Sequence, residues 1–181
     1  MFTLRLAAPA DLPALQELIP LSARSLSQGW YSPEQIESAV RYVFGPDSQL
    51  IADGTYLVAV AGGRIVGCGG WSRRSTLYGG DQMKPGADPL LDPPRDAARI
   101  RAFFVHPAFA RRGIGAAILR ACMEAASRAG FDRAELMATL PGVPLYRSFG
   151  FEEMEAVSNT LPDGVTVPFV RMARQLGTAR A

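Results

Sequence analysis

The pattern of apolar and polar positions in the first part of the chain predicts one strand and two helices. Residues 2–7 alternate between apolar and polar side chains, which is typical of a half-buried strand. Residues 11–19 place leucines and an isoleucine at helical spacing, and we expect Pro20 to interrupt this helix. The sequence Ser-Pro-Glu-Gln at 32–35 is a capping box that begins a second helix, and Gly-Pro at 45–46 ends it.

The middle of the chain predicts a hairpin followed by a long loop. Residues 55–61 and 64–71 are β-forming runs on either side of Gly62 and Gly63, which supply the positive φ that a tight turn needs. Residues 76–97 are rich in Gly, Pro and Asp and show no periodicity. A loop of this length inside a compact domain is more often functional than idle.

The remaining part predicts a central strand and a long helix before further short elements. Residues 99–105 are apolar on both faces, as a central strand should be, and a helix follows that ends at Gly130. Pro168 has no backbone N–H to donate to a neighbouring strand, so we expect its strand to be bulged or at an edge of the sheet. The other predicted elements are a strand at 134–139, a short helix at 142–149, and strands at 151–159 and 165–173.

Composition describes an ordinary folded domain. Hydrophobic residues make up 48% of the 181 residues and charged residues 20%, which excludes a disulfide-dependent mini-protein and a disordered chain. The net charge of +2 gives no reason to expect a nucleic-acid or membrane partner. Cys68 and Cys122 are isolated, which argues against a metal site and a disulfide framework. With no secretory signal and no run of about 18 apolar residues, we expect a cytoplasmic protein.

The strongest chemical signal lies between the central strand and the long helix. Arg111 and Arg112 precede Gly113-x-Gly115 at the predicted helix start, where free N–H groups and the positive dipole end attract an anion, most often phosphate. A glycine-containing helix start without a ligand is one alternative. A dinucleotide site is another, but Ile118 replaces its third glycine, and seven residues, 106–112, separate the strand from the first glycine.

Two motifs in this chain match a known family. The stretch FFVHPAFARRGIGA at 103–116 resembles the acyl-CoA-binding motif of the GNAT acetyltransferase superfamily, and LYRSFGF at 145–151 resembles its second signature. The resemblance covers nearly the whole chain and implies an α/β fold of the α+β type. It implies one domain at 1–175, with a tail at 176–181, whose twisted sheet is mixed and mostly antiparallel, with about seven strands and about four flanking helices.

The resemblance implies acetyl-CoA as co-substrate and no metal. Pantetheine would lie in a gap beside the central strand, and the pyrophosphate would sit on backbone N–H groups at the helix start. Tyr146 would stand near the thioester sulfur and act as general acid to the CoA thiolate. The residues expected to contact the cofactor are Phe103, Phe104, Val105, Ala110, Arg111, Arg112, Gly113, Ile114, Gly115, Ala116 and Arg147.

Three positions depart from the family pattern. Ala110 stands where Gln or Arg is usual, but backbone groups do most of the cradling, so CoA binding is expected to survive. Arg99 stands where many members have Glu, which removes the commonest candidate base. Thr139 replaces a frequent Asn seven residues before Tyr146. His106, the only histidine, precedes a proline at a strand end, and we expect its role to be structural.

An acceptor pocket is expected where the hairpin runs into the long loop. Side chains alternate along a strand, so one of two adjacent arginines would face the cleft and clamp a carboxylate or phosphate, while Asp81 would hold an ammonium. The alternative is a solvated loop with an arginine stacked on Trp71. The residues expected to contact the acceptor are Trp30, Tyr31, Trp71, Arg73, Arg74, Tyr78 and Asp81.

Two functions remain open from the sequence. The first is an acetyl-CoA-dependent N-acetyltransferase acting on a primary amine of a small molecule or peptide. The second is a catalytically idle acyl-CoA-binding or sensor module of the same fold. Tyr146 and the long polar loop favour the enzyme. The sequence does not name the acceptor, and it leaves a homodimer open.

Overall fold

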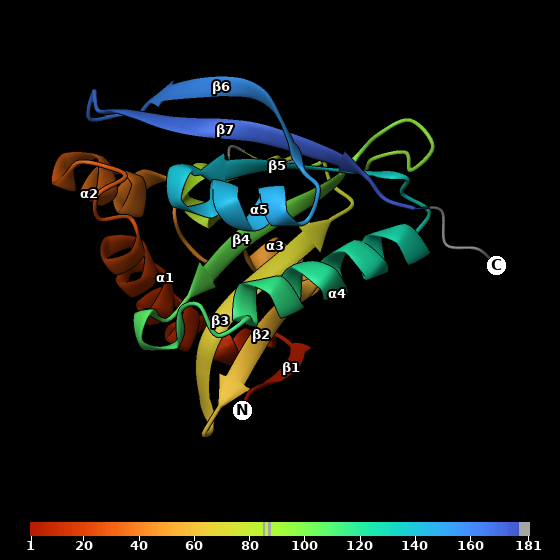
Figure 1. Cartoon of the computed structure of the whole chain (residues 1–181), viewed down its shortest axis with the longest axis horizontal. Helices are drawn as coiled ribbons and strands as arrows, with labels where there is room; N and C mark the ends of the chain where they lie inside the picture. Colours follow the sequence, from red (N-terminus) through yellow and green to blue (C-terminus); the bar gives the residue numbers. More distant parts are fainter. Residues whose placement is uncertain (85, 87, 178–181) are drawn as a thin grey trace.

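The computed structural model describes residues 1–84, 86 and 88–177, which form one seven-stranded sheet with five α-helices (Figure 1). The strands are β1 (Thr3–Leu6), β2 (Tyr56–Ala61), β3 (Arg64–Ser72), β4 (Ala98–Val105), β5 (Arg133–Thr139), β6 (Glu152–Thr160) and β7 (Thr166–Gln175). The α-helices are α1 (Leu12–Leu26), α2 (Pro33–Tyr42), α3 (Ser48–Ala52), α4 (Ile114–Arg128) and α5 (Val143–Ser148).

The sheet is mixed and mostly antiparallel, as predicted. Its strand order is β1-β2-β3-β4-β5-β7-β6, and of these neighbouring pairs β4–β5 is the parallel one. Each face carries its own cluster of buried apolar side chains. Helices α1, α2 and α3 contribute to one cluster, and α4 and α5 contribute to the other. The molecule is therefore a three-layer arrangement with the sheet in the middle.

Local signals in the sequence are confirmed where they are strong. Strands β2 and β3 form the expected hairpin, and Gly62 and Gly63 at its turn have φ of 55° and 76°. The capping box of α2 is complete: Ser32 Oγ accepts from the Gln35 N–H at 3.2 Å, and Gln35 Oε1 accepts from the Ser32 N–H at 3.0 Å. These contacts need only neighbouring residues, so the sequence alone predicts them.

Two helical predictions were wrong. Helix α1 runs through Pro20 to Leu26, because Ser22 and Ala23 beyond the proline are buried against the sheet. That burial outweighs the one backbone hydrogen bond that proline removes. Helix α3 was not predicted. It begins directly after Asp47, whose carboxylate accepts from the backbone N–H groups of the helix's first turn.

The prediction that Pro168 lies at a bulge or on an edge strand was also wrong. Strand β7 lies between β5 and β6, and Pro168 is in regular register with Ser158 of β6. On the other side, β5 has already ended at Thr139. There the Tyr31 hydroxyl donates to the Pro168 carbonyl at 2.7 Å and accepts from the Leu140 N–H at 2.9 Å. A side chain thus replaces one rung of the ladder.

Three further observations concern the expected core and tail. Cys68 and Cys122 are buried free thiols. Leu176, which the sequence assigned to the tail, is buried, and its N–H bonds the Asp132 carbonyl at 2.6 Å. Residues 178–181 of that tail lie outside the described residues. Within the described part of the chain, no helix combines the length and apolar character needed to cross a membrane.

Replacing Tyr31 by Phe should lower the free energy of unfolding by about 1–3 kcal/mol, because two buried backbone groups lose their shared partner. Burial raises the pKa of Tyr31 to about 12, so the folded state holds this proton more tightly than the unfolded chain does. The contribution of the Tyr31 hydroxyl to the free energy of unfolding is therefore complete at neutral pH and is lost as pH rises through about 12. Urea denaturation measures the effect. The matched control is Tyr42→Phe on α2, and equal stability of both variants would contradict the bridging role.

Candidate functional site

The sheet opens between its two parallel strands. Strands β4 and β5 pair only through Ala98 with Ala134 and Arg99 with Glu135, and beyond these residues β4 runs away from β5 (Figure 1). The opening leads into a cavity of about 720 Å³. This volume lies in the range of small-molecule sites, and the cavity is the first candidate for a binding site.

A bulge at Ala102 turns β4 away from its neighbour. The register of β3 against β4 shifts between Cys68 and Gly70, and Ala102 has a φ of 57°. The turned carbonyl of Ala102 accepts from the Tyr56 hydroxyl at 3.2 Å and from Cys68 Sγ at 3.7 Å. Tyr56 and Cys68 are fully buried, so donors from the interior hold the bulge in place.

Helix α4 begins at the edge of the cavity. Gly113 is its N-cap, with a φ of 81° and no capping side chain, and the Ala117 N–H bonds the Gly113 carbonyl at 2.9 Å. The preceding N–H groups of the first turn face outward, which makes an anion site. Glycines on β3 allow this helix to lie close: a Cβ on Gly67 would stand 2.6 Å from Ile114.

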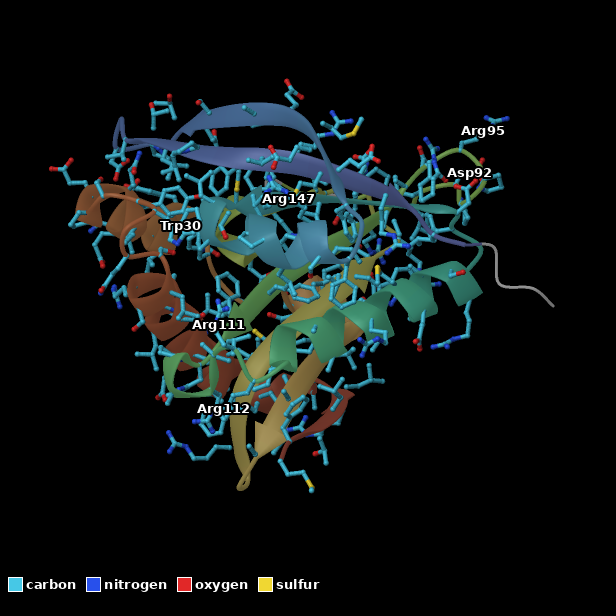
Figure 2. All side chains as sticks on the ribbon, viewed as in Figure 1. Trp30, Asp92, Arg95, Arg111, Arg112 and Arg147 are labelled. Carbon is cyan, nitrogen blue, oxygen red and sulfur yellow. The ribbon has the colours of Figure 1, made fainter. Side chains whose placement is uncertain are left out.

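Nine of the eleven residues expected to contact the cofactor line the cavity. The other two do not: Arg112 stacks over the Phe109 ring at 5.2 Å, and Arg147 pairs with Glu153 (Figure 2). The nine are Phe103, Phe104, Val105, Ala110, Arg111, Gly113, Ile114, Gly115 and Ala116.

The sequence missed one contact at this edge. Ser22 of α1 is buried in the cavity wall, and its Oγ accepts from the Val105 N–H at 3.1 Å. The Val105 N–H is thus occupied by Ser22 and is not available to a ligand. No local pattern marks Ser22, because it lies in a helix that was expected to end at Pro20.

Tyr146 on α5 lines the cavity with its ring edge-to-face against Phe103 at 6.1 Å and Phe151 at 6.0 Å. Its hydroxyl makes no hydrogen bond to the described part of the chain. Burial raises the pKa of Tyr146 well above its usual range, with a smaller effect from Cys122, so the hydroxyl keeps its proton at neutral pH. It is a free hydrogen-bond donor inside the cavity.

Two residues expected at the acceptor side also line the cavity. Trp30 lies at its rim with 51% of its surface exposed (Figure 2). Tyr78 packs its ring 5.7 Å from that of Phe169, and its hydroxyl accepts from Asn159 Nδ2 at 3.0 Å. Tyr31 follows Trp30 directly but is buried in its bridge between strands and does not line the cavity.

The expected anion clamp was wrong, because neither arginine faces the cavity. Trp71 is buried against Phe131 on the α4 side of the sheet, and the exposed Arg73 stacks on it at 5.5 Å. Arg74 already has a carboxylate: its Nε and Nη2 donate to Asp53 at 2.7 and 2.9 Å. The alternative of an arginine stacked on Trp71 is therefore the one observed.

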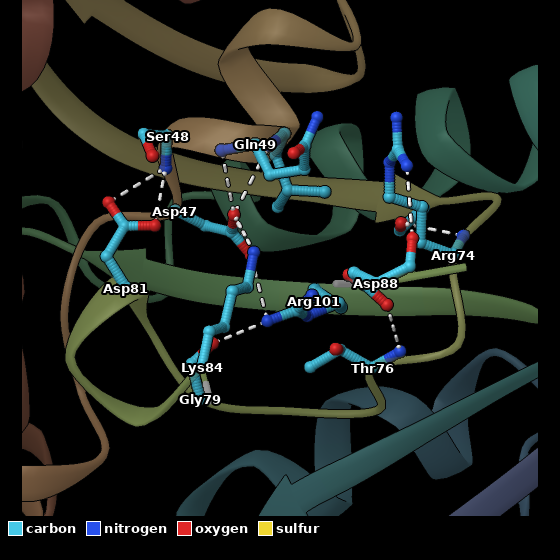
Figure 3. A network of polar contacts seen from close by, with 12 residues as sticks. Asp47, Ser48, Gln49, Arg74, Thr76, Gly79, Asp81, Lys84, Asp88 and Arg101 are labelled. Atoms are coloured by element: carbon cyan, nitrogen blue, oxygen red, sulfur yellow. Dashed lines mark hydrogen bonds and ion pairs between the residues drawn. The ribbon is translucent and has the colours of Figure 1, made fainter. Parts of the chain in front are cut away.

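The buried arginine of this region is Arg101, which the sequence analysis missed (Figure 3). Its side chain is 1% exposed, pairs with Asp47 at 2.8 Å and donates to the Gly79 carbonyl. Burial lowers the pKa of Arg101, and the charge of Asp47 opposes this. Asp47 also holds Lys84 Nζ at 2.5 Å. An arginine inside a buried strand must find a partner, so its place in 99–105 was the available signal.

The same network fixes the loop that closes the acceptor side. The carboxylate of Asp81 accepts from the Ser48 N–H at 3.0 and 3.1 Å. Contrary to the prediction, Asp81 therefore does not face the cavity. The Gly80 N–H bonds the Val43 carbonyl at 2.8 Å. Residues 77–84 are thus fastened to the segment that connects α2 to α3, and the two segments form one wall (Figure 3).

His106 has the structural role that the sequence predicts for it. His106 Nδ1 accepts from the Ala108 N–H at 3.2 Å and caps the short turn that follows β4. Among the described residues, no three His, Cys, Asp or Glu side chains gather as a metal ion would need.

Comparison with known proteins gives the following relatives. The family model described as Acetyltransferase (GNAT) domain matches residues 52–153, and no curated protein sequence matches the chain. The fold is similar to that of the GCN5-related N-acetyltransferase from Rhodopseudomonas palustris, with a TM-score of 0.71 and 20% identity over 96% of this chain and 95% of that one. It is also similar to yncA from Salmonella typhimurium, solved with its cofactor acetyl-CoA, with a TM-score of 0.65 and 18% identity over 100% and 97% of the chains.

Asp47→Asn should lower the free energy of unfolding by about 3–5 kcal/mol, because it leaves the Arg101 charge buried without a counter-charge. Asn still caps a helix well, so the change keeps the cap and removes the charge that pairs with Arg101 and Lys84. The matched control is Asp53→Asn, whose pair with Arg74 is partly exposed and should cost only about 1 kcal/mol. Thermal and urea denaturation compare the two. An equal loss of unfolding free energy in the two variants would show that the buried ion pair contributes no more to stability than the partly exposed one.

Proposed function

Because the matched family model covers more than half of this chain, the chain belongs to the GNAT acetyltransferase family, and we propose that the protein transfers an acetyl group from acetyl-CoA to an amine. The acceptor is a primary amine of a small molecule or peptide. The observation that carries this proposal is one cavity that joins the start of α4, the free edge of β4 and the Tyr146 hydroxyl.

The residues present fit acetyl-CoA. The pyrophosphate would be held by N–H groups of the first turn of α4, with Arg111 adding charge at the same edge. The Phe103 and Val105 backbone would face the pantetheine amides along the edge that β5 leaves open. A Cβ on Gly113 would meet open space, so the cradle has room for a ligand there, whereas one on Gly115 would stand 3.2 Å from Leu145, so Gly115 lets α4 lie close to α5.

The transfer needs an uncharged amine and a stabilised sulfur. The amine nitrogen attacks the thioester carbonyl, the new N–C bond forms, the C–S bond breaks, and the proton lost by nitrogen balances the one gained by sulfur. The Tyr146 hydroxyl donates a hydrogen bond to the sulfur as it becomes a thiolate. A proton that Tyr146 passes to the sulfur is replaced by the proton that the nitrogen loses, so the tyrosine ends the reaction protonated, as its raised pKa favours.

An idle acyl-CoA-binding or sensor module is the second candidate. It is favoured by one observation: no Asp, Glu or His among the described residues lines the cavity to act as a base. Release of free thiol from acetyl-CoA distinguishes the two. An enzyme releases thiol faster when amines are added, and a sensor binds acetyl-CoA without amine-dependent release.

Gly115→Glu should abolish acetyl-CoA binding. The side chain would fill the cradle and add a negative charge beside the pyrophosphate, at the end of α4 that favours anions. Calorimetry with acetyl-CoA measures the loss. Ala129→Glu adds the same charge at the exposed far end of α4 and should leave the affinity unchanged. Unchanged affinity in folded Gly115→Glu would mean that phosphate binds elsewhere.

Tyr146→Phe should lower kcat by at least about tenfold and leave acetyl-CoA affinity within a few-fold, because it removes the donor but keeps the ring. Because the pKa of Tyr146 is raised, the wild-type rate should not fall from tyrosine ionisation as pH rises to about 10. Steady-state thiol release across pH tests both statements. Full activity of the variant would mean that the thiolate needs no donor from this residue.

A further inference from the structure

The acceptor side of the cavity is free of acidic side chains. We use this name for the part lined by Leu26, Trp30, Phe44, Leu77, Tyr78 and Phe169. Among all described residues that line the cavity, the charged ones are Arg101 and Arg111. A substrate with several ammonium groups therefore finds no carboxylate among the described residues that line the cavity.

The carboxylates that lie nearby are already occupied and turned into the wall (Figure 3). Asp47 is fully buried between Arg101 and Lys84. Asp81 holds the Ser48 N–H, and Asp88 accepts from the Thr76 N–H at 2.8 Å and from Ser75 Oγ at 3.1 Å. To reach the cavity, each of these groups would have to abandon hydrogen bonds that hold the loop, so none is available as a counter-ion for a substrate.

The rest of the acceptor side is apolar and partly open at its rim. Phe44 and Phe169 are buried and meet edge to face at 6.5 Å, and Tyr78 covers Phe169. At the rim, Trp30 is 51% exposed and Leu26 is 36% exposed, and these two side chains continue the apolar wall to the opening of the cavity. An apolar or aromatic body would remove this surface from water.

We infer that the acceptor is a monoamine carried on an aromatic or branched apolar body, with no second cationic group; this rests on the proposed acetyl transfer. The apolar wall binds the body. A site of low polarity without a carboxylate disfavours an ammonium ion, so the amine is bound as the free base. Its proton goes to water before binding, and the absence of a carboxylate base is consistent with this order.

The experiment compares two commercial amines, phenethylamine and spermidine, as acceptors for the wild-type protein by thiol release from acetyl-CoA. We expect kcat/KM to favour phenethylamine by about 100-fold or more, because spermidine keeps charges that the cavity does not neutralise. Spermidine as the better acceptor would overturn the inference and leave the proposed function intact. Thiol release that no amine accelerates, with acetyl-CoA bound, would overturn the proposed function and the inference with it.

A variant at the rim tests the cause of the preference. Leu26→Glu places one carboxylate at the acceptor side and should reduce the ratio of the two kcat/KM values by about tenfold, mainly by improving spermidine. The matched control is Leu21→Glu, which changes an exposed leucine of the same helix that does not line the cavity, and it should leave the ratio unchanged. An unchanged ratio in Leu26→Glu, or the same change in Leu21→Glu, would overturn the electrostatic explanation.

Discussion

The hydrogen bonds from Tyr56 and Cys68 to the carbonyl of Ala102 hold β4 in a conformation that a regular strand does not adopt. A positive φ at alanine costs about 1–2 kcal/mol, and two buried donors that need an acceptor offset it. Without this bulge, β4 would continue its pairing with β5 beyond Arg99, and the sheet would close where the cavity lies. The binding site therefore depends on one backbone carbonyl turned inward and on the interior groups that satisfy it.

The residue before the bulge, Arg101, supplies a charge to the cavity wall. Ile100 and Phe103 pack in the α4 cluster, whereas Ala102 and Phe104 pack in the opposite one, so the alternation of β4 is broken at this point. Arg101 precedes this break, so regular alternation from Ile100 places it on the side of α3, where it pairs with Asp47. Strand β4 thus links the bulge to the loop over the acceptor side, because Arg101, the residue before Ala102, also donates to the Gly79 carbonyl of that loop.

The sequence predicted the parts of this protein that neighbouring residues specify. The hairpin at Gly62 and Gly63 is of this kind and is as expected, and the predicted helix start at Gly113 lies at the edge of the cavity, although Arg112 beside it does not line the cavity. Helix α1 beyond Pro20 is not specified by neighbouring residues, since its last turns depend on burial against a sheet that forms from distant residues. The acceptor side was predicted least well. Its walls come from segments near residues 26, 44, 78 and 169, which no local pattern connects.

The polar residues of the loop misled the sequence analysis for a physical reason. A charge beside a cavity is costly unless it is paired, and a folded chain pairs it with its own groups when they are within reach. Arg74 pairs with Asp53, and the Asp81 carboxylate accepts from a backbone N–H. The polar segment therefore supports the wall of the cavity and does not form its inner surface. What remains on the acceptor side is mainly apolar. In the transfer that we propose, such a surface would favour an apolar acceptor and lower the pKa of its amine, so one property of the wall would support binding and reactivity together.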